Sequence, residues 1–106
     1  LTVLYEELIF RGILIGLFQR YFSVWRSIVV SSILFGLWHL LSATNIQSDA
    51  APNNEALVIL GTFIATSLAG VGLAFIRIKS ESLLAPIFAH WAINASSIII
   101  VYIAWP

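Results

Sequence analysis

Four side chains suited to hydrolytic chemistry are spread through an otherwise apolar sequence of 106 residues: Glu6, His39, His90 and Asn94. A glutamate can take a proton from water, and a histidine can hold that water or share the proton. A second histidine and an asparagine can donate hydrogen bonds to the oxyanion that forms when water attacks a peptide carbonyl. Together these residue types favour hydrolysis by an activated water, provided that the fold brings them together.

The stretch YEELIFRG, residues 5–12, places two glutamates and an arginine in an apolar neighbourhood. Glu7 and Arg11 are four residues apart with the acid first, which is the favourable order for an ion pair on a helix. We therefore expect this pair to have a supporting role. Glu6 points about 100° away from Glu7 around a helix and is less neutralised by Arg11, so it is the better candidate for a base.

Both histidines share a helix face with a second candidate residue. His90 and Asn94 are four residues apart, and so are Phe35 and His39, which places each pair on one side of a helix. Phe35 is expected to support the site by shielding His39 from lipid or water.

The composition is that of a protein embedded in a membrane. Hydrophobic residues make up 60% of the sequence and charged residues only 9%, against about a quarter in a typical soluble domain. Mean hydropathy is +1.00, and residues 82–106 carry no charge. The net charge of zero gives no indication of a nucleic-acid partner. The absence of cysteine excludes disulfides, thiolate catalysis and cysteine-bound metal.

Four hydrophobic segments predict an all-α, polytopic transmembrane bundle of about four helices, at residues 2–19, 26–42, 56–77 and 82–105. The polar stretch 42–55 predicts a loop, and Pro86 fits the first turn of the last helix. Small residues four apart favour close packing of membrane helices; they are Gly12 and Gly16, Ser32 and Gly36, and Gly61, Ala65 and Ala69. We expect one domain, 1–106, which lacks methionine and is therefore expected to be part of a longer chain.

The spacing also predicts that the candidate residues lie at one depth in the membrane. Arg20, Arg26, Arg77 and Lys79 lie on the first and third linkers, which the positive-inside rule assigns to the cytoplasm. A helix rises about 1.5 Å per residue. The expected depths from these linkers are about 21, 20, 17 and 23 Å for the glutamate at position 6, the two histidines and the asparagine. Intramembrane ionisable residues usually mark a functional site.

Other interpretations of these residues remain open. A buried histidine or asparagine often serves only as a hydrogen bond between membrane helices. Signatures of other intramembrane proteases, HExxH, GxGD and GxSxG, are missing from the sequence. Glu6, His39 and His90 could still form a zinc site with one open position, although no cofactor is required by the activated-water hypothesis.

Three motifs resemble those of one membrane protease family. EELIFR matches EExxxR, FGLWH matches FxxxH and HWAIN matches HxxxN, in that order and on separate predicted helices. The set is similar to the CAAX protease and bacteriocin-processing family, also called CPBP or Abi. This resemblance implies an intramembrane glutamic endopeptidase in which Glu6 and His39 activate water, while His90 and Asn94 form the oxyanion hole. Glu7 and Arg11 match motif positions with a supporting role.

The leading hypothesis is thus an endopeptidase that acts on a peptide or a membrane-associated protein, with prenylated and bacteriocin-like proteins as candidates. We expect a multi-pass protein in the lipid bilayer of a bacterial-type plasma membrane. The alternative is a non-catalytic membrane protein, such as a bacteriocin-immunity or scaffolding factor. A proton-coupled carrier is disfavoured because no pair of broken helices is apparent in the sequence.

Overall fold

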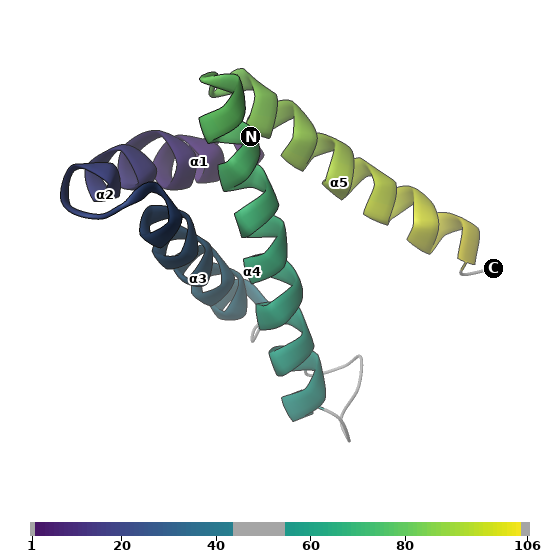
Figure 1. The fold of residues 1–106 in the computed structure, drawn as a ribbon. Coiled ribbons are helices and arrows are strands. Elements are labelled where there is room, and N and C mark those ends of the chain that lie inside the picture. Colours follow the sequence, from purple (N-terminus) through teal and green to yellow (C-terminus); the bar gives the residue numbers. More distant parts are fainter. Residues whose placement is uncertain (1, 44–54, 105–106) are drawn as a thin grey trace.

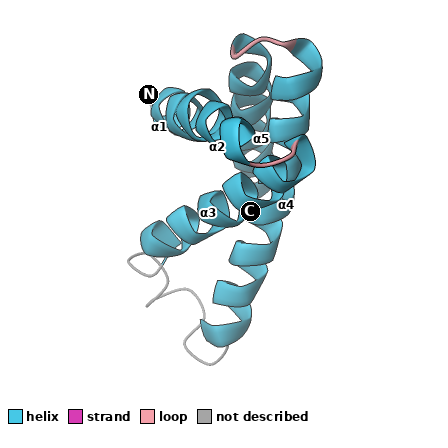
Figure 2. Cartoon of the chain, turned by 60° about the vertical axis from the view of Figure 1, so that its left-hand side comes forward, coloured by secondary structure: helices cyan, strands magenta, loops and turns pink. Residues whose placement is uncertain are grey.

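The computed structural model describes residues 2–43 and 55–104, and Figure 1 shows their arrangement. These residues form only helices and short turns, as Figure 2 also shows, so the all-α prediction is confirmed. The predicted loop at 42–55 falls mainly on residues 44–54, which lie outside the described residues. The elements are α1 (Thr2–Glu7), the π-helix η1 (Leu8–Leu14), α2 (Ile15–Tyr21), α3 (Val24–Ala43), α4 (Glu55–Ser80) and α5 (Leu84–Ala104).

The first three elements form one continuous helical run from Thr2 to Tyr21, close to the first predicted segment. Its middle part, η1, is π-helical, and the backbone N–H of Ile15 donates to the carbonyl of Phe10, five residues earlier. Short π-helical segments inside α-helices are rare and occur frequently at functional sites. This one begins directly after Glu7, and nothing in the sequence pattern predicted it.

Serine side chains help to begin the helices that follow the two described turns. Ser23 precedes α3 and accepts a hydrogen bond from the backbone N–H of Arg26 at 3.3 Å, the usual arrangement of a helix N-cap. Ser82 accepts from the backbone N–H of Leu84 at 3.2 Å. Pro86 lies in the first turn of α5 as predicted, where its missing N–H costs little. In both short turns, a backbone N–H group at the start of the next helix is therefore hydrogen-bonded to a nearby serine.

Helices α3 and α4 approach each other closely at two glycines. A Cβ atom built on Gly36 would lie 3.1 Å from the carbonyl oxygen of Phe63, and one on Gly70 would lie 3.2 Å from the Cα of Ser32. Small residues allow such contact between membrane helices. Ser32 and Gly36 thus lie at a close helix–helix contact, as their spacing predicted.

Two other glycines from the predicted sets of small residues, Gly16 and Gly61, do not lie at a close helix–helix contact. Nothing lies within 4 Å of a Cβ built on Gly16 or on Gly61. Spacing of four places small residues on one helix face, but it does not say whether another helix meets that face. Gly70, which contacts α3, was not among the predicted residues.

Three helices are long and apolar enough to cross a membrane: Val24–Leu41, Ala56–Ser80 and Leu84–Ala104. The protein is therefore an integral membrane protein. The N-terminal helical run carries Glu6, Glu7 and Arg11 and is not one of the three. In Figure 1, α5 diverges from α3 and α4, and residues 91–104 are all exposed. The predicted compact bundle thus holds for α3 and α4, while the second half of α5 stands apart.

Candidate active site

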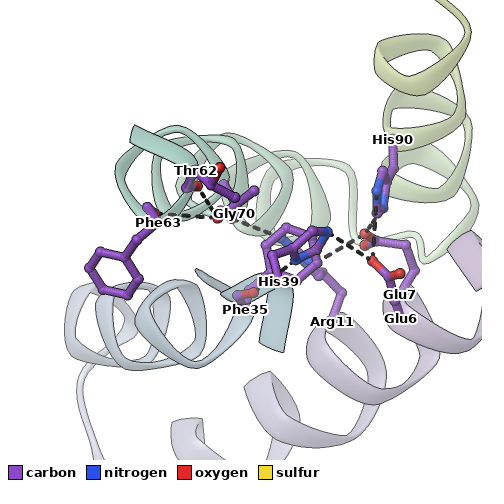
Figure 3. Close-up of polar contacts among 10 residues, drawn as sticks. Glu6, Glu7, Arg11, Phe35, His39, Thr62, Phe63, Gly70 and His90 are labelled. Carbon is purple, nitrogen blue, oxygen red and sulfur yellow. Dashed lines mark hydrogen bonds and ion pairs between the residues drawn. The ribbon is translucent and has the colours of Figure 1, made fainter. Parts of the chain in front are cut away.

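Glu6 and the two histidines meet where α1, α3 and α5 come together (Figure 3). Oε2 of Glu6 lies 3.6 Å from Nε2 of His39 and 3.8 Å from Nε2 of His90. The Glu6 side chain is 17% exposed, against 26% for His39 and 6% for His90. Oε2 of Glu6 is buried and has no hydrogen-bond partner among the described residues. Three ionisable side chains from three helices thus lie next to one another and are largely shielded from solvent.

Both imidazole rings are held through their Nδ1 atoms. Nδ1 of His39 lies 2.9 Å from the backbone carbonyl of Phe35, and Nδ1 of His90 lies 2.6 Å from Oε1 of Glu7. A carbonyl oxygen accepts but never donates, so Nδ1 of His39 carries the proton. The bond at one nitrogen determines which nitrogen is free for other work. In both rings, Nε2 is therefore the atom that faces Glu6.

Arg11 connects the N-terminal helical run to α4 from a fully buried position. Its Nη1 donates to Oε1 of Glu7 at 3.1 Å, and its Nη2 donates to the backbone carbonyl of Gly70 at 3.2 Å. The guanidinium also lies over the Phe35 ring, 4.2 Å from the centroid. The predicted Glu7–Arg11 ion pair is confirmed. A buried pair with these further partners orients the helix that carries Glu6 against α3 and α4.

Phe35 packs against both histidines, as well as against Arg11. Its ring centroid lies 4.4 Å from that of His39 and 5.7 Å from that of His90. The side chain is only 2% exposed. Phe35 therefore forms a wall behind the two imidazoles, in line with the shielding predicted for His39.

A cavity of about 280 Å³ adjoins the two histidines. Asn94, one helical turn beyond His90, lines this cavity and is exposed. Two hydroxyl groups in the wall are bonded within their own helices: Thr66 donates to a carbonyl at 2.6 Å and Ser97 at 2.9 Å. The remaining wall is formed by apolar side chains, namely Phe35, Ala65, Ala69, Leu73 and Ile93. The cavity is large enough for a peptide side chain beside the histidines.

The structure thus brings His39 and His90 each within 4 Å of Glu6 and places Asn94 in the wall of the adjoining cavity. The contact between Glu7 and His90 was not expected from the sequence, because 83 residues separate the two. The carbonyl of Gly70 as a partner of Arg11 was also missed. Neither contact leaves a local signal. Within residues 2–43 and 55–104, no group of three or more His, Asp or Glu side chains is arranged to hold a metal ion.

The amino-acid sequence is similar to that of one known protein family. A family model described as type II CAAX prenyl endopeptidase Rce1-like matches residues 1–96. The chain belongs to this family. The match confirms the resemblance based on the three motifs, and the matched range contains Glu6, His39, His90 and Asn94. No curated protein and no solved structure matches the chain. Membership indicates a CAAX-type membrane protease whose substrate is a membrane-associated protein.

Proposed function

We propose that this protein is an intramembrane endopeptidase that hydrolyses a peptide bond with a water molecule activated by Glu6. One observation carries the proposal. Oε2 of Glu6 is a buried oxygen without a hydrogen-bond partner among the described residues, and it lies 3.6 and 3.8 Å from Nε2 of His39 and His90. A buried, unpaired carboxylate oxygen is costly, so its presence in a folded protein calls for an explanation, and a catalytic role is one.

One water molecule can bridge Glu6 and His39 by donating a hydrogen bond to each. His39 carries its proton on Nδ1, so Nε2 of the neutral ring is an acceptor, as is the Glu6 carboxylate. Two acceptors 3.6 Å apart do not bond to each other, but one water can donate a hydrogen to each. Its lone pair is then free to attack a carbonyl carbon.

The proposed reaction needs no covalent enzyme intermediate. The water oxygen bonds to the scissile carbonyl carbon while Glu6 takes one proton, as a general base does. The carbonyl oxygen becomes an oxyanion. When the carbon–nitrogen bond breaks, the proton held by Glu6 passes to the leaving nitrogen, and the products are a carboxylic acid and an amine. His39 orients the water throughout.

His90 and Asn94 are the proposed donors to the oxyanion. Both line the cavity beside the histidines and lie four residues apart on α5, so they face the same side of the helix. Donors aimed at developing negative charge contribute strongly in a site shielded from water. Glu7, Arg11 and Phe35 support this arrangement through the buried contacts described above.

The proposed substrate is a membrane-associated protein, either prenylated or bacteriocin-like, and the proposed location is a bacterial-type plasma membrane. Support for the prenylated class comes from the family, whose description names CAAX prenyl endopeptidases. The wall of the cavity is largely apolar, and its two hydroxyl groups, of Thr66 and Ser97, are bonded within their own helices, which supports a substrate presented from the bilayer.

The test is cleavage of a farnesylated CAAX peptide and of a bacteriocin precursor by the protein in lipid vesicles. Glu6→Gln keeps the size and a hydrogen-bonding group but removes the base, and we expect activity to fall by about 10²- to 10⁴-fold. Glu81→Gln is the matched control, because Glu81 is exposed in the turn after α4. Undiminished cleavage by a folded Glu6→Gln protein would refute the mechanism. Absence of any cleavage by the unmodified protein would favour a non-catalytic immunity or scaffolding role.

A further inference from the structure

Glu7 is a fully buried carboxylate that takes no direct part in the reaction proposed above. We propose that Glu7 positions His90: its Oε1 accepts the Nδ1–H bond of the ring and thereby fixes Nε2 as the nitrogen that faces the reacting groups. This inference rests on the proposed function and assigns Glu7 a role beyond that of a counter-ion for Arg11.

The distances support a direct role toward His90. Oε1 of Glu7 lies 2.6 Å from Nδ1 of His90 and 3.1 Å from Nη1 of Arg11. An ionised carboxylate oxygen can accept both bonds, and the shorter one goes to the imidazole. Short bonds of this kind are typical of charge-assisted pairs. Arg11, fully buried beside Glu7, donates to the same carboxylate oxygen and holds it in place.

Without Glu7, the described contacts of His90 do not determine which nitrogen faces the site. The Phe35 ring lies 5.7 Å away, centroid to centroid, in an edge-to-face arrangement that constrains the plane of the imidazole but accepts either tautomer. Glu6 is 3.8 Å from Nε2, beyond hydrogen-bond distance. The bond to Glu7 is therefore the contact that specifies both ring orientation and tautomer.

The same bond prepares Nε2 to donate to the oxyanion. If Nδ1 carries a proton that is bonded to Glu7, Nε2 can donate only when the ring is doubly protonated and positive. The charged and titratable groups around the ring are Glu6, Glu7 and, behind these, Arg11 and His39. The two carboxylates both lie within 4 Å of the ring, Glu7 beside Nδ1 and Glu6 beside Nε2. Glu7 thus holds a donor toward the position at which negative charge develops.

Two double variants separate positioning from structural support. Glu7→Leu with Arg11→Met removes both charges and leaves no hydrogen-bonding group next to His90. Glu7→Gln with Arg11→Met also removes both charges, but its amide can still bond to Nδ1. Neither protein contains a buried unpaired charge, which is the usual cause of misfolding after loss of one partner. The two proteins differ only in whether residue 7 can hold the ring.

We expect the leucine variant to lose about 10²-fold in kcat, comparable to loss of an oxyanion donor, with KM little changed. The glutamine variant should be at least about tenfold more active in kcat than the leucine variant. Equal kcat values in the two folded proteins would show that Glu7 has only a structural role and would overturn the inference.

A spectroscopic measurement tests the same contact independently of proteolysis. The ¹⁵N chemical shifts of the His90 ring, assigned by their loss in His90→Gln, should show a protonated, hydrogen-bonded Nδ1 in the unmodified protein. This signal should persist in Glu7→Gln with Arg11→Met and be lost in Glu7→Leu with Arg11→Met. An unprotonated Nδ1 in the unmodified protein would overturn the inference, even if the protein cleaves no peptide. Failure of the proposed function is recognised separately, by unaltered cleavage in Glu6→Gln.

Discussion

Gly70→Ala is the substitution for which the structure predicts a coupled loss of stability and activity. A Cβ at this position would lie 3.2 Å from Cδ1 of Phe35, 3.2 Å from the Cα of Ser32 and 3.3 Å from its Cβ. One of these contacts is with backbone, so relief requires a movement of α3 relative to α4 by a few tenths of an ångström. The carbonyl of Gly70 also accepts the bond from Arg11.

The size of the effect follows from two terms. Overpacking of a close interface costs about 1–3 kcal/mol in the free energy of unfolding, while replacing a helical glycine by alanine contributes about 1 kcal/mol in the opposite direction. Gly72→Ala, on the same helix, experiences the second term alone, because nothing lies within 4 Å of its Cβ position. The difference between the two variants therefore isolates the packing cost of about 1–3 kcal/mol.

Activity should fall as well, because Phe35 is the ring that supports both histidines. A displacement of about 1 Å in a catalytic group can cost about 10²-fold in rate. A shift of a few tenths of an ångström should then lower kcat by about three- to tenfold.

The assay combines unfolding in detergent with peptide cleavage in vesicles, for the unmodified protein, Gly70→Ala and Gly72→Ala. If the two alanine variants have the same stability and the same kcat, then α3 and α4 do not meet as closely at Gly70 as the structure indicates. The coupling of that contact to the histidines would be refuted as well.

Two further predictions concern the oxyanion and the zinc alternative. Asn94→Ala should lower kcat by about 10²- to 10³-fold with little effect on KM, since an oxyanion donor acts in the transition state. The control is Ser96→Ala, a substitution at an exposed residue of the same helix. An equal effect of the two substitutions on kcat would contradict the role of Asn94. Cleavage should be unchanged after treatment with a strong chelator, because the proposed base is Glu6 itself; loss of activity that added zinc restores would favour the metal-dependent mechanism.

Much of the candidate site was predictable because its components are local on the helices. Glu7 pairs with Arg11 because a separation of four residues places them on one helix face. The prediction that three helices bring Glu6 and the histidines together relied on depth in the membrane, and each histidine does lie within 4 Å of Glu6. Depth alone leaves rotation about the helix axis undetermined. The contact of Glu7 with Nδ1 of His90, whose Nε2 faces Glu6, could therefore not be inferred from depth.

The amino-acid sequence by itself determined the class of the protein and the candidate residues of its site. Apolar segments of this length must satisfy their backbone within helices in a bilayer, and helical periodicity places residues four apart on one face. Only the tertiary structure decided which faces meet. The bonds of Arg11 to Gly70 and of Glu7 to His90 span 59 and 83 residues, and such contacts depend on how the helices pack. Packing is a property of whole surfaces, so no short stretch of sequence specifies it.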